Sequence, residues 1–342
     1  MPKSSRISAA QLTVLLLASR LSGCLLLTNQ AIGRMPFADS LLSIAFNGVL
    51  LFFLCLPTLW VGGTLNRAYG KSRRLGRVVG ILYLLLCVFL LCIDVLQFHD
   101  FAEKVMKSEL SVPLLTASLV VVAFLASWYG VGALARAALP VAVFSLACLL
   151  VFGLSLIPEM RHWYFPVGEQ RNALAIVRTA VADLPRTAEI TVLGLLLPAV
   201  NQKRGRAVFA FTSSTSLITA GITATALSVL GDFALHTAYP YYTAATAAQI
   251  GVFERMDMLI VAVWLATFFV RITLFACAFT TTARRVCSRF FGVLTAVGAA
   301  VPCAVALLLP TAVNSAVITT VYWCVLGAFC VGLPCILRRR RV

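Results

Sequence analysis

Long apolar stretches separated by short basic or polar loops dominate this sequence. Because one bilayer crossing takes about 20 residues, the pattern predicts ten membrane-spanning helices. They are expected at roughly 11–32, 40–62, 77–99, 111–130, 137–157, within 170–201, and at 207–230, 256–281, 291–310 and 316–337. Hydrophobic residues make up 61% of the 342 residues and charged residues only 12%, against about a quarter in soluble domains. The chain is therefore expected to be an all-α integral membrane protein, one domain over 1–342.

The distribution of Lys and Arg predicts the orientation of this bundle. If the N-terminus is cytoplasmic, eighteen basic residues and no acidic residue fall on the inner side. These are Lys3, Arg6, Arg67, Lys71, Arg73, Arg74, Arg77, Arg136, Lys203, Arg204, Arg206, Arg284, Arg285, Arg289 and Arg338–Arg341. Since basic loops stay in the cytoplasm, both ends are predicted to be cytoplasmic. Anionic lipid facing these loops accounts for the net charge of +16 without nucleic acid.

The stretch from Gln170 to Asn201 is too long for one simple crossing, and "ADLPRTAE" lies in its middle. Pro185 removes a backbone donor and disfavours helix at the residue before it. One interpretation is an interfacial helix, a turn and a short span. The other is a discontinuous membrane helix with non-helical backbone within Asp183–Ala188, a device that exposes backbone groups to a ligand.

The first span offers a second candidate break. Its centre, "LLLASRLSGCLLL", carries Ser19, Arg20, Ser22 and Gly23. Gly and Ser loosen a helix, and an arginine at this depth is costly unless it faces the bundle or water. Because paired interrupted helices mark transporter sites, non-helical backbone is also predicted within Ser19–Cys24, facing the other break near mid-membrane.

A charged face is predicted on the eighth span, where Trp264, Thr267 or Phe268, and Arg271 recur at helical spacing. Because it carries an arginine, this face is expected to point into the bundle. Arg271 lies about 21 Å inward from Asp257 at 1.5 Å per residue. Its guanidinium is expected either to bind carbonyl groups exposed by an unwound first helix or to snorkel to the inner interface. Glu254, Arg255 and Asp257 would cap the helix at the outer mouth or act in gating.

Two buried acids invite separate hypotheses. Glu189 is the best candidate for contact with a ligand's ammonium group, or else it pairs with Arg20 or Arg178. Asp94 is expected to pair with a neighbour rather than to titrate.

Enzymatic chemistry is the least favoured class. The three histidines fall in outer loops without metal-ligand spacing, and the eleven scattered cysteines are typical of small core residues. Nothing in the sequence resembles an ATP site or a nucleophile elbow. No cofactor, metal or nucleic-acid partner is expected.

One motif carries a family resemblance. Tyr239–Pro240, twelve further residues and then "FERMDMLIVAVWLATFFVRITLF" resemble the spore germination permeases, the B subunits of germinant receptors. That family lies within the amino acid–polyamine–organocation transporter superfamily. The stretches "QLTVLLLASRLSGCLLL", "LGRVVGILYLLL" and "AEITVLGLLLPAVNQKR" are similar to the family more loosely, in the same order. The first span departs from it, with Thr28 where a proline is expected and with Arg20.

The resemblance implies a LeuT-like fold of two inverted five-helix repeats, about 11–157 and 170–337, with helices 1 and 6 discontinuous around a small ligand. The third and eighth helices would flank it. Ligand contacts are then expected at Ser22, Gly23, Glu189, Thr191, Trp264 and Thr267. Structural or gating charges are expected at Arg20, Arg271, Glu254, Arg255 and Asp257. In sodium-coupled relatives a cation lies between the first and eighth helices, and the fixed charge of Arg271 could replace it.

Three functions remain open. The resemblance implies a subunit of a germinant receptor in the inner spore membrane, binding an amino-acid-like nutrient and working with receptor A and C subunits. The second is a stand-alone, ion-coupled amino-acid transporter on the same fold. The third is a scaffold that has lost its pocket.

Overall fold

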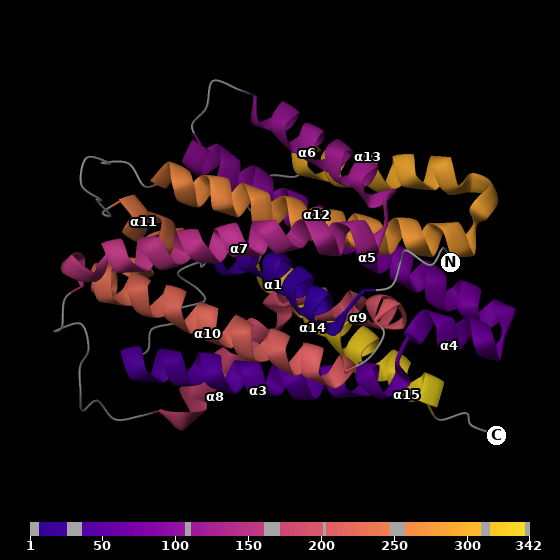
Figure 1. The fold of residues 1–342 in the computed structure, drawn as a ribbon, viewed down its shortest axis with the longest axis horizontal. Coiled ribbons are helices and arrows are strands. Elements are labelled where there is room, and N and C mark those ends of the chain that lie inside the picture. Colours follow the sequence, from indigo (N-terminus) through magenta and orange to yellow (C-terminus); the bar gives the residue numbers. More distant parts are fainter. Residues whose placement is uncertain are drawn as a thin grey trace.

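The computed structural model of the chain describes residues 7–25, 36–106, 111–160, 172–200, 203–246, 257–308 and 315–338. These residues form a bundle of helices (Figure 1). Within them, the β contact is an isolated bridge between Ile7 and Val200. The predicted all-α class is confirmed.

Seven helices are long and apolar enough to cross a membrane. They are Phe37–Lys71, Arg73–Val105, Val131–Ser155, Arg204–Ala234, Met258–Val286, Ser288–Leu308 and Thr320–Arg338. Each coincides with one of the ten predicted spans. Shorter apolar helices, Ala9–Leu25, Val112–Ser127 and Ala188–Ala199, lie at the other three, and their crossing of the bilayer stays a prediction.

The named α-helices follow the chain in this order: α1 (Ala9–Leu25), α3 (Phe37–Val61), α4 (Thr64–Lys71), α5 (Arg73–Phe101), α6 (Val112–Ser127), α7 (Val131–Ser155), α8 (Ala173–Asp183), α9 (Leu193–Leu196), α10 (Arg204–Leu230), α11 (Pro240–Thr246), α12 (Asp257–Val286), α13 (Phe291–Leu308), α14 (Ser315–Leu326) and α15 (Leu333–Arg338).

Helices α1 and α12 form the centre of the bundle. Every residue from Val270 to Thr280 on α12 is buried, as is every residue from Leu15 to Ser22 on α1. A helix buried on all sides is a core helix. α1 packs against α7, α10 and α12, and α12 also packs against α5 and α6, as Figure 1 shows. Polar groups on these two helices must therefore find partners inside the protein.

The peripheral helices show the opposite pattern. α7 exposes Val143 and Leu150, and α13 exposes Val293. Exposed apolar faces of this extent mark contact with a membrane. These exposed apolar faces of the bundle are thus suited to lipid, whereas Arg20, Asp94, Glu189 and Arg271 are buried inside it.

The predicted interruption between Asp183 and Ala188 is confirmed. α8 ends at Asp183, a 3-10 turn covers Leu184–Arg186, and Thr187 leaves the helical region with φ −95° and ψ 58°. A second 3-10 segment, Ala188–Val192, then leads into the single turn of α9. Pro185 stands within the first 3-10 turn, where its missing N–H removes one backbone hydrogen bond. The depth of this break in a bilayer stays a prediction.

The predicted break in the first span is wrong. α1 is a continuous α-helix through Ser19–Cys24. A helix interior loses about 3 kcal/mol at a proline but only about 1 kcal/mol or less at Gly or Ser, and α1 contains no proline. Ser22 Oγ also donates to the Ser19 carbonyl at 2.8 Å, within the helix. Of the two helices expected to be discontinuous, the sixth is interrupted, whereas the first is continuous over its described residues, Ala9–Leu25.

Candidate functional site

The interrupted segment lies against the middle of α1. All five residues of Ala188–Val192 are buried, although 3-10 geometry gives them poorer backbone hydrogen bonds than an α-helix. At its C-terminal end the segment is tied to the residues before α1, because Ile7 N donates to the Ala199 carbonyl at 2.9 Å. Two groups of charged side chains hold its middle.

Arg271 on α12 makes the first group by binding two carboxylates. Its Nε lies 2.8 Å from Asp94 Oδ2 on α5, and its Nη1 donates to Glu189 Oε1 in the 3-10 segment. The three side chains are 5%, 1% and 0% exposed, respectively. Breaking a buried ion pair costs about 3–5 kcal/mol because one charge is left uncompensated. This group, called here the acidic cluster, therefore fixes the interrupted segment to α5 and α12.

The contacts in the acidic cluster test the predicted partners of Asp94, Glu189 and Arg271. The pairing of Asp94 with a neighbour is confirmed. The expected partners of Glu189 are wrong, because it pairs with Arg271. Both interpretations of Arg271 are also wrong: it is only 4% exposed, so it does not snorkel, and continuous α1 has no unwound carbonyl groups to offer. Its role as a substitute for a bound cation stays a prediction.

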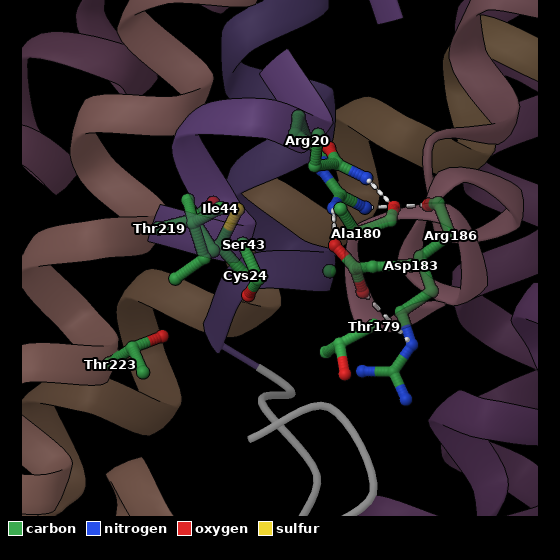
Figure 2. Close-up of a pocket in the computed structure, with 12 residues that line it drawn as sticks. Arg20, Cys24, Ser43, Ile44, Thr179, Ala180, Asp183, Arg186, Thr219 and Thr223 are labelled. Carbon is green, nitrogen blue, oxygen red and sulfur yellow. Dashed lines mark hydrogen bonds and ion pairs between the residues drawn. The ribbon is translucent and has the colours of Figure 1, made fainter. Parts of the chain in front are cut away.

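Arg20 on α1 makes the second group with residues at the break (Figure 2). Its Nη1 donates to the Arg186 carbonyl at 2.6 Å, and its Nη2 lies 3.9 Å from Asp183 Oδ2. Arg186 Nε lies 3.3 Å from the other oxygen of the same carboxylate. Two guanidinium groups thus share one carboxylate in this basic cluster. Arg20 is 4% exposed, so its charge is buried.

A small polar pocket opens beside the basic cluster, between α1, α3, α8 and α10 (Figure 2). It is lined by Arg20, Gly23, Cys24, Ser43, Ile44, Asn47, Thr179, Ala180, Asp183, Arg186, Thr219 and Thr223. The volume open to the centre of a water molecule is about 20 Å³. Since one water needs about 10–15 Å³ by this measure, the pocket is closed to an amino acid in this conformation.

Gly23 lies between the two clusters. A Cβ atom at this position would stand 3.3 Å from Arg20 Nη1 and 3.4 Å from Arg271 Nη1. Both guanidinium groups therefore border the space that a side chain at Gly23 would fill.

The residues predicted to contact a ligand are buried but do not share this pocket. Of the six, Gly23 lines it. Three others bond back to their own backbone: Ser22 to Ser19, Thr191 to the Ala188 carbonyl at 2.6 Å, and Thr267 to the Val263 carbonyl at 3.0 Å.

The indole of Trp264 packs in an aromatic group. It stacks on Phe98 with ring centroids 5.3 Å apart and contacts Phe101 and Phe268. Glu189 belongs to the acidic cluster. Contact of these residues with a ligand therefore stays a prediction.

Several buried polar atoms have no hydrogen-bond partner in the part of the chain that the structure describes. In the acidic cluster these are Asp94 Oδ1 and Glu189 Oε2, and in the basic cluster Arg20 Nε. Ser19 Oγ and Thr187 Oγ1, on the two facing segments, are also unpartnered there. Buried polar groups without partners cost about 1–3 kcal/mol each. Each of these atoms needs a partner such as a bound water, and further unpartnered atoms, among them Ser145 Oγ and Thr215 Oγ1, lie elsewhere in the described residues.

The acid–base group predicted at the outer mouth is only partly visible. Glu254 and Arg255 lie outside the described residues, and Asp257 is the first residue of α12, with its side chain undescribed. Their capping or gating role stays a prediction.

The Tyr–Pro motif has a definite place near the end of α5. The Tyr239 hydroxyl donates to Asp100 Oδ2 at 2.7 Å, and Asp100 also pairs with Lys104 at 2.7 Å. Burial, together with the bonded carboxylate, raises the pKa of Tyr239. Tyr239 therefore stays neutral and acts as a hydrogen-bond donor that ties this loop to α5.

Sequence reasoning missed the basic cluster as a unit. Its signal was present, because Asp183 and Arg186 stand three residues apart inside the predicted break and Arg20 stands in mid-helix. The sequence could not show that Arg20 binds the Arg186 carbonyl, since the two residues are 166 positions apart in the chain.

Comparison with protein families gives one result. Residues 6–314 match the model of the spore permease family, described as spore germination protein. The match covers most of the chain, including both clusters and the Tyr–Pro motif. No curated protein matches the sequence.

Proposed function

Because the chain belongs to the spore germination protein family, we propose that it is the transporter-fold subunit of a spore germinant receptor. In this proposal it resides in the inner spore membrane and binds a small nutrient, such as an amino acid. Family membership and the seven long apolar helices place it among integral membrane proteins linked to germination. A permease family also favours a transporter-like protein over an enzyme.

The observation that carries the proposal is the interrupted segment facing the buried charges of α1, α5 and α12, which are Arg20, Asp94 and Arg271. Interrupted helices place ligand sites near the bilayer midplane in transporter folds. Here the break at Thr187 lies between an acidic and a basic cluster, beside a polar pocket. Ionisable residues buried in a membrane protein are costly and mark functional sites.

The proposed ligand site includes the six residues expected from the sequence, Ser22, Gly23, Glu189, Thr191, Trp264 and Thr267, with Arg20 and Arg271 as its fixed charges. All eight residues lie in the bundle interior, and Gly23 lines the pocket. Because the pocket has room for about one water, binding requires a more open conformation. A nutrient that binds only the open form would shift the population towards it, and that shift is the proposed signal.

For the fold, we propose ten spans in two inverted repeats, 11–157 and 170–337, with both ends in the cytoplasm. The bias of basic residues towards the inner loops supports this orientation. Cys287, which directly follows α12, should then react with an impermeant thiol reagent only from the cytoplasmic side. An Arg161→Cys variant should react only from outside, and reaction of both from one side would refute the topology.

Signalling in this scheme requires other chains. The inner loops are short, so no sizeable soluble domain within 1–342 could transmit the signal. We propose that receptor A and C subunits detect the change in the bundle, while lipid surrounds its apolar faces. Nucleic acid has no part in this function.

The test is nutrient germination in the native spore-forming host. Deletion of the gene should abolish germination with one nutrient class while leaving a receptor-independent trigger effective. Gly23→Leu should reproduce this loss without lowering the amount of protein in the membrane. The matched control is Gly221→Leu on α10, where a Cβ would meet nothing within 4 Å. A wild-type response from Gly23→Leu would favour a scaffold that has lost its pocket.

A second candidate is a stand-alone, ion-coupled amino-acid transporter. The acidic cluster favours it specifically, because buried carboxylates in membrane helices serve as ion or proton sites in transporters. Lipid vesicles containing this chain alone would accumulate an amino acid along an ion gradient if this function were correct. Accumulation, together with unchanged nutrient germination in the deletion strain, would replace the receptor proposal with this one.

A further inference from the structure

The end of the bundle that carries α4 and α15 (Figure 1) is rich in basic side chains, which fall into two groups. Those of the first group are held by a carbonyl oxygen or an aromatic ring of the protein: Arg67, Lys71, Arg204, Arg284, Arg285, Arg289 and Arg338. The second group is Arg73, Arg74 and Arg77 at the start of α5. All three are exposed, and their guanidinium groups have no hydrogen bond, ion pair or ring contact among the described residues. Unpaired positive charge is therefore concentrated within about one turn of α5.

The junction between α4 and α5 holds this second group in a fixed place. Ser72 is extended, with φ −162° and ψ 140°, and its Oγ accepts from the Arg74 amide at 3.3 Å. α4 can pack closely along the start of α5, because a Cβ at Gly76 would stand 2.4 Å from the ring of Tyr69. The Tyr69 hydroxyl also donates to the Arg285 carbonyl at 3.2 Å. The three arginines thus project from a packed helix end.

An apolar strip continues along the same face of α5. Its four side chains are 42% to 64% exposed and follow the arginines at helical spacing: Val78, Ile81, Leu82 and Leu85. From Arg77 to Leu85 the helix rises about 12 Å at 1.5 Å per residue, which fits within one leaflet, half of a hydrocarbon core of about 30 Å. In the next turn Phe89 is covered by Tyr322, with ring centroids 5.4 Å apart. The face therefore presents free positive charge followed by an apolar strip of one leaflet's length.

We propose that this face of α5 is a binding site for one negatively charged phospholipid. The lipid phosphate is received by Arg73, Arg74 and Arg77, and an acyl chain lies along the apolar strip. A guanidinium can form two parallel hydrogen bonds with a phosphate. The chain supplies no counter-charge in this region, since no Asp or Glu occurs between Asp39 and Asp94. This inference is independent of the nutrient and of the proposed receptor function.

The order of the groups along α5 favours a lipid over other anions. Charge and apolar strip follow each other on one helix face, as phosphate and acyl chain do in a phospholipid. A free phosphate, or an acidic protein segment in water, would use only the arginines. Because the first group of basic side chains is already held by the protein, the site is also distinct from a general attraction of basic loops to an anionic leaflet.

Native mass spectrometry of the purified full-length chain in detergent can measure this binding. The probes are phosphatidylglycerol and, as the neutral control, phosphatidylcholine with the same acyl chains. Wild type should bind the first much more tightly. Changing Arg73, Arg74 and Arg77 together to Gln should weaken phosphatidylglycerol about 100-fold, from about fivefold for each arginine. Glycerol phosphate, which has no acyl chain, should not compete.

The matched control removes three other exposed charges without described partners, by changing Arg136, Lys203 and Arg206 on or beside α7 and α10 to Gln. It should bind phosphatidylglycerol like wild type. Equal weakening by the two triple variants would indicate diffuse attraction and refute the inference. Unchanged binding in the α5 variant would refute it too, and would leave the arginines to another occupant such as an acidic protein segment. Competition by glycerol phosphate would show that the site binds a free phosphate rather than a lipid.

A measurement on wild type keeps the inference testable if the α5 variant misfolds. In lipid nanodiscs, a photoreactive phosphatidylglycerol should cross-link within Arg73–Leu85, as located by mass spectrometry of the peptides. Excess unlabelled phosphatidylglycerol should prevent this cross-link, and phosphatidylcholine should not. Cross-links spread evenly over the lipid-facing helices would contradict a site on α5.

Discussion

Two segments of this chain carry the same kind of sequence signal and fold differently. Both α1 and the segment from α8 to α9 place small, polar and charged residues in the middle of an apolar stretch. α1 remains one helix through Ser19–Cys24, whereas the other segment leaves the helical conformation at Thr187. One difference is the proline, because Pro185 cannot donate a backbone hydrogen bond, whereas Ser and Gly only weaken a helix. A proline alone does not end a helix here, since α3, α7 and α13 continue through Pro57, Pro140 and Pro302. Polar residues in an apolar helix therefore indicate a site, but not a break.

The comparison extends to what happens at the break. In a regular helix the Arg186 carbonyl would accept from the amide four residues later, that of Ile190. Here it accepts from Arg20 Nη1 instead, and Ile190 N contacts the Thr187 carbonyl at 3.4 Å. The continuous helix thus supplies the hydrogen bond that the interrupted one lacks. Each segment depends on the other.

The largest expected effect concerns the acidic cluster, which holds the interrupted segment to α5 and α12. Arg271→Leu leaves Asp94 and Glu189 buried without a counter-charge, and should lower the free energy of unfolding by about 3–5 kcal/mol. Unfolding of the purified protein in detergent, followed by fluorescence, measures this.

Two further variants serve as a control and a rescue for Arg271→Leu. Arg206→Leu, at an exposed position of α10, should change stability by no more than about 0.5 kcal/mol. Removing both acids as well, in Arg271→Leu with Asp94→Asn and Glu189→Gln, should restore much of the loss. An Arg271→Leu variant as stable as wild type would mean that the acidic cluster does not hold the segment.

The continuity of α1 is tested next by inserting a proline. Ser22→Pro should cost about 3 kcal/mol or more, because it removes an intrahelical hydrogen bond and clashes with the preceding turn. Ala10→Pro, in the first turn of the same helix where the amide has no intrahelical partner, should cost little. Similar unfolding midpoints for the two variants would show that α1 is already broken near Ser22.

A smaller effect is expected when the proline of the break is removed. Pro185→Ala should destabilise by about 0.4–1 kcal/mol, chiefly by increasing the freedom of the unfolded chain. The segment should stay interrupted, because Arg20 still binds the Arg186 carbonyl. Pro158→Ala, in the exposed 3-10 turn Ile157–Glu159, is the matched control. A clear gain in helical circular dichroism in Pro185→Ala alone would show that the proline was the sole cause of the break.

The sequence was informative about elements and less so about their partners. Apolar runs located every described membrane helix, and Pro185 located the break, because both signals are local. The spacing of Trp264, Thr267 and Arg271 correctly predicted an inward face. The partners of Arg271 could not be predicted, since Glu189 is 82 residues away in the chain and Asp94 is 177 residues away.

The predicted break in α1 was wrong because polar residues were treated as if they break a helix. Ser19, Ser22 and Gly23 lower helix propensity slightly, but burial against α7, α10 and α12 outweighs that cost. This part of α1 serves contacts instead, since Gly23 leaves room beside two guanidinium groups and Arg20 binds the Arg186 carbonyl at the break. A pocket closed to about the size of one water also could not be foreseen from residue types alone.

A native cysteine allows the most direct test of the central claim, that a nutrient binds between α1 and the interrupted segment. Cys24 lines the pocket and is 3% exposed, whereas Cys148 lies on α7 outside it. Alkylation of each thiol by a small reagent can be followed by mass spectrometry in membranes, with and without the nutrient that triggers germination. The account predicts that the nutrient changes the alkylation rate of Cys24 and leaves that of Cys148 unaltered. An unchanged rate at Cys24, with a nutrient that does trigger germination through this chain, would contradict it.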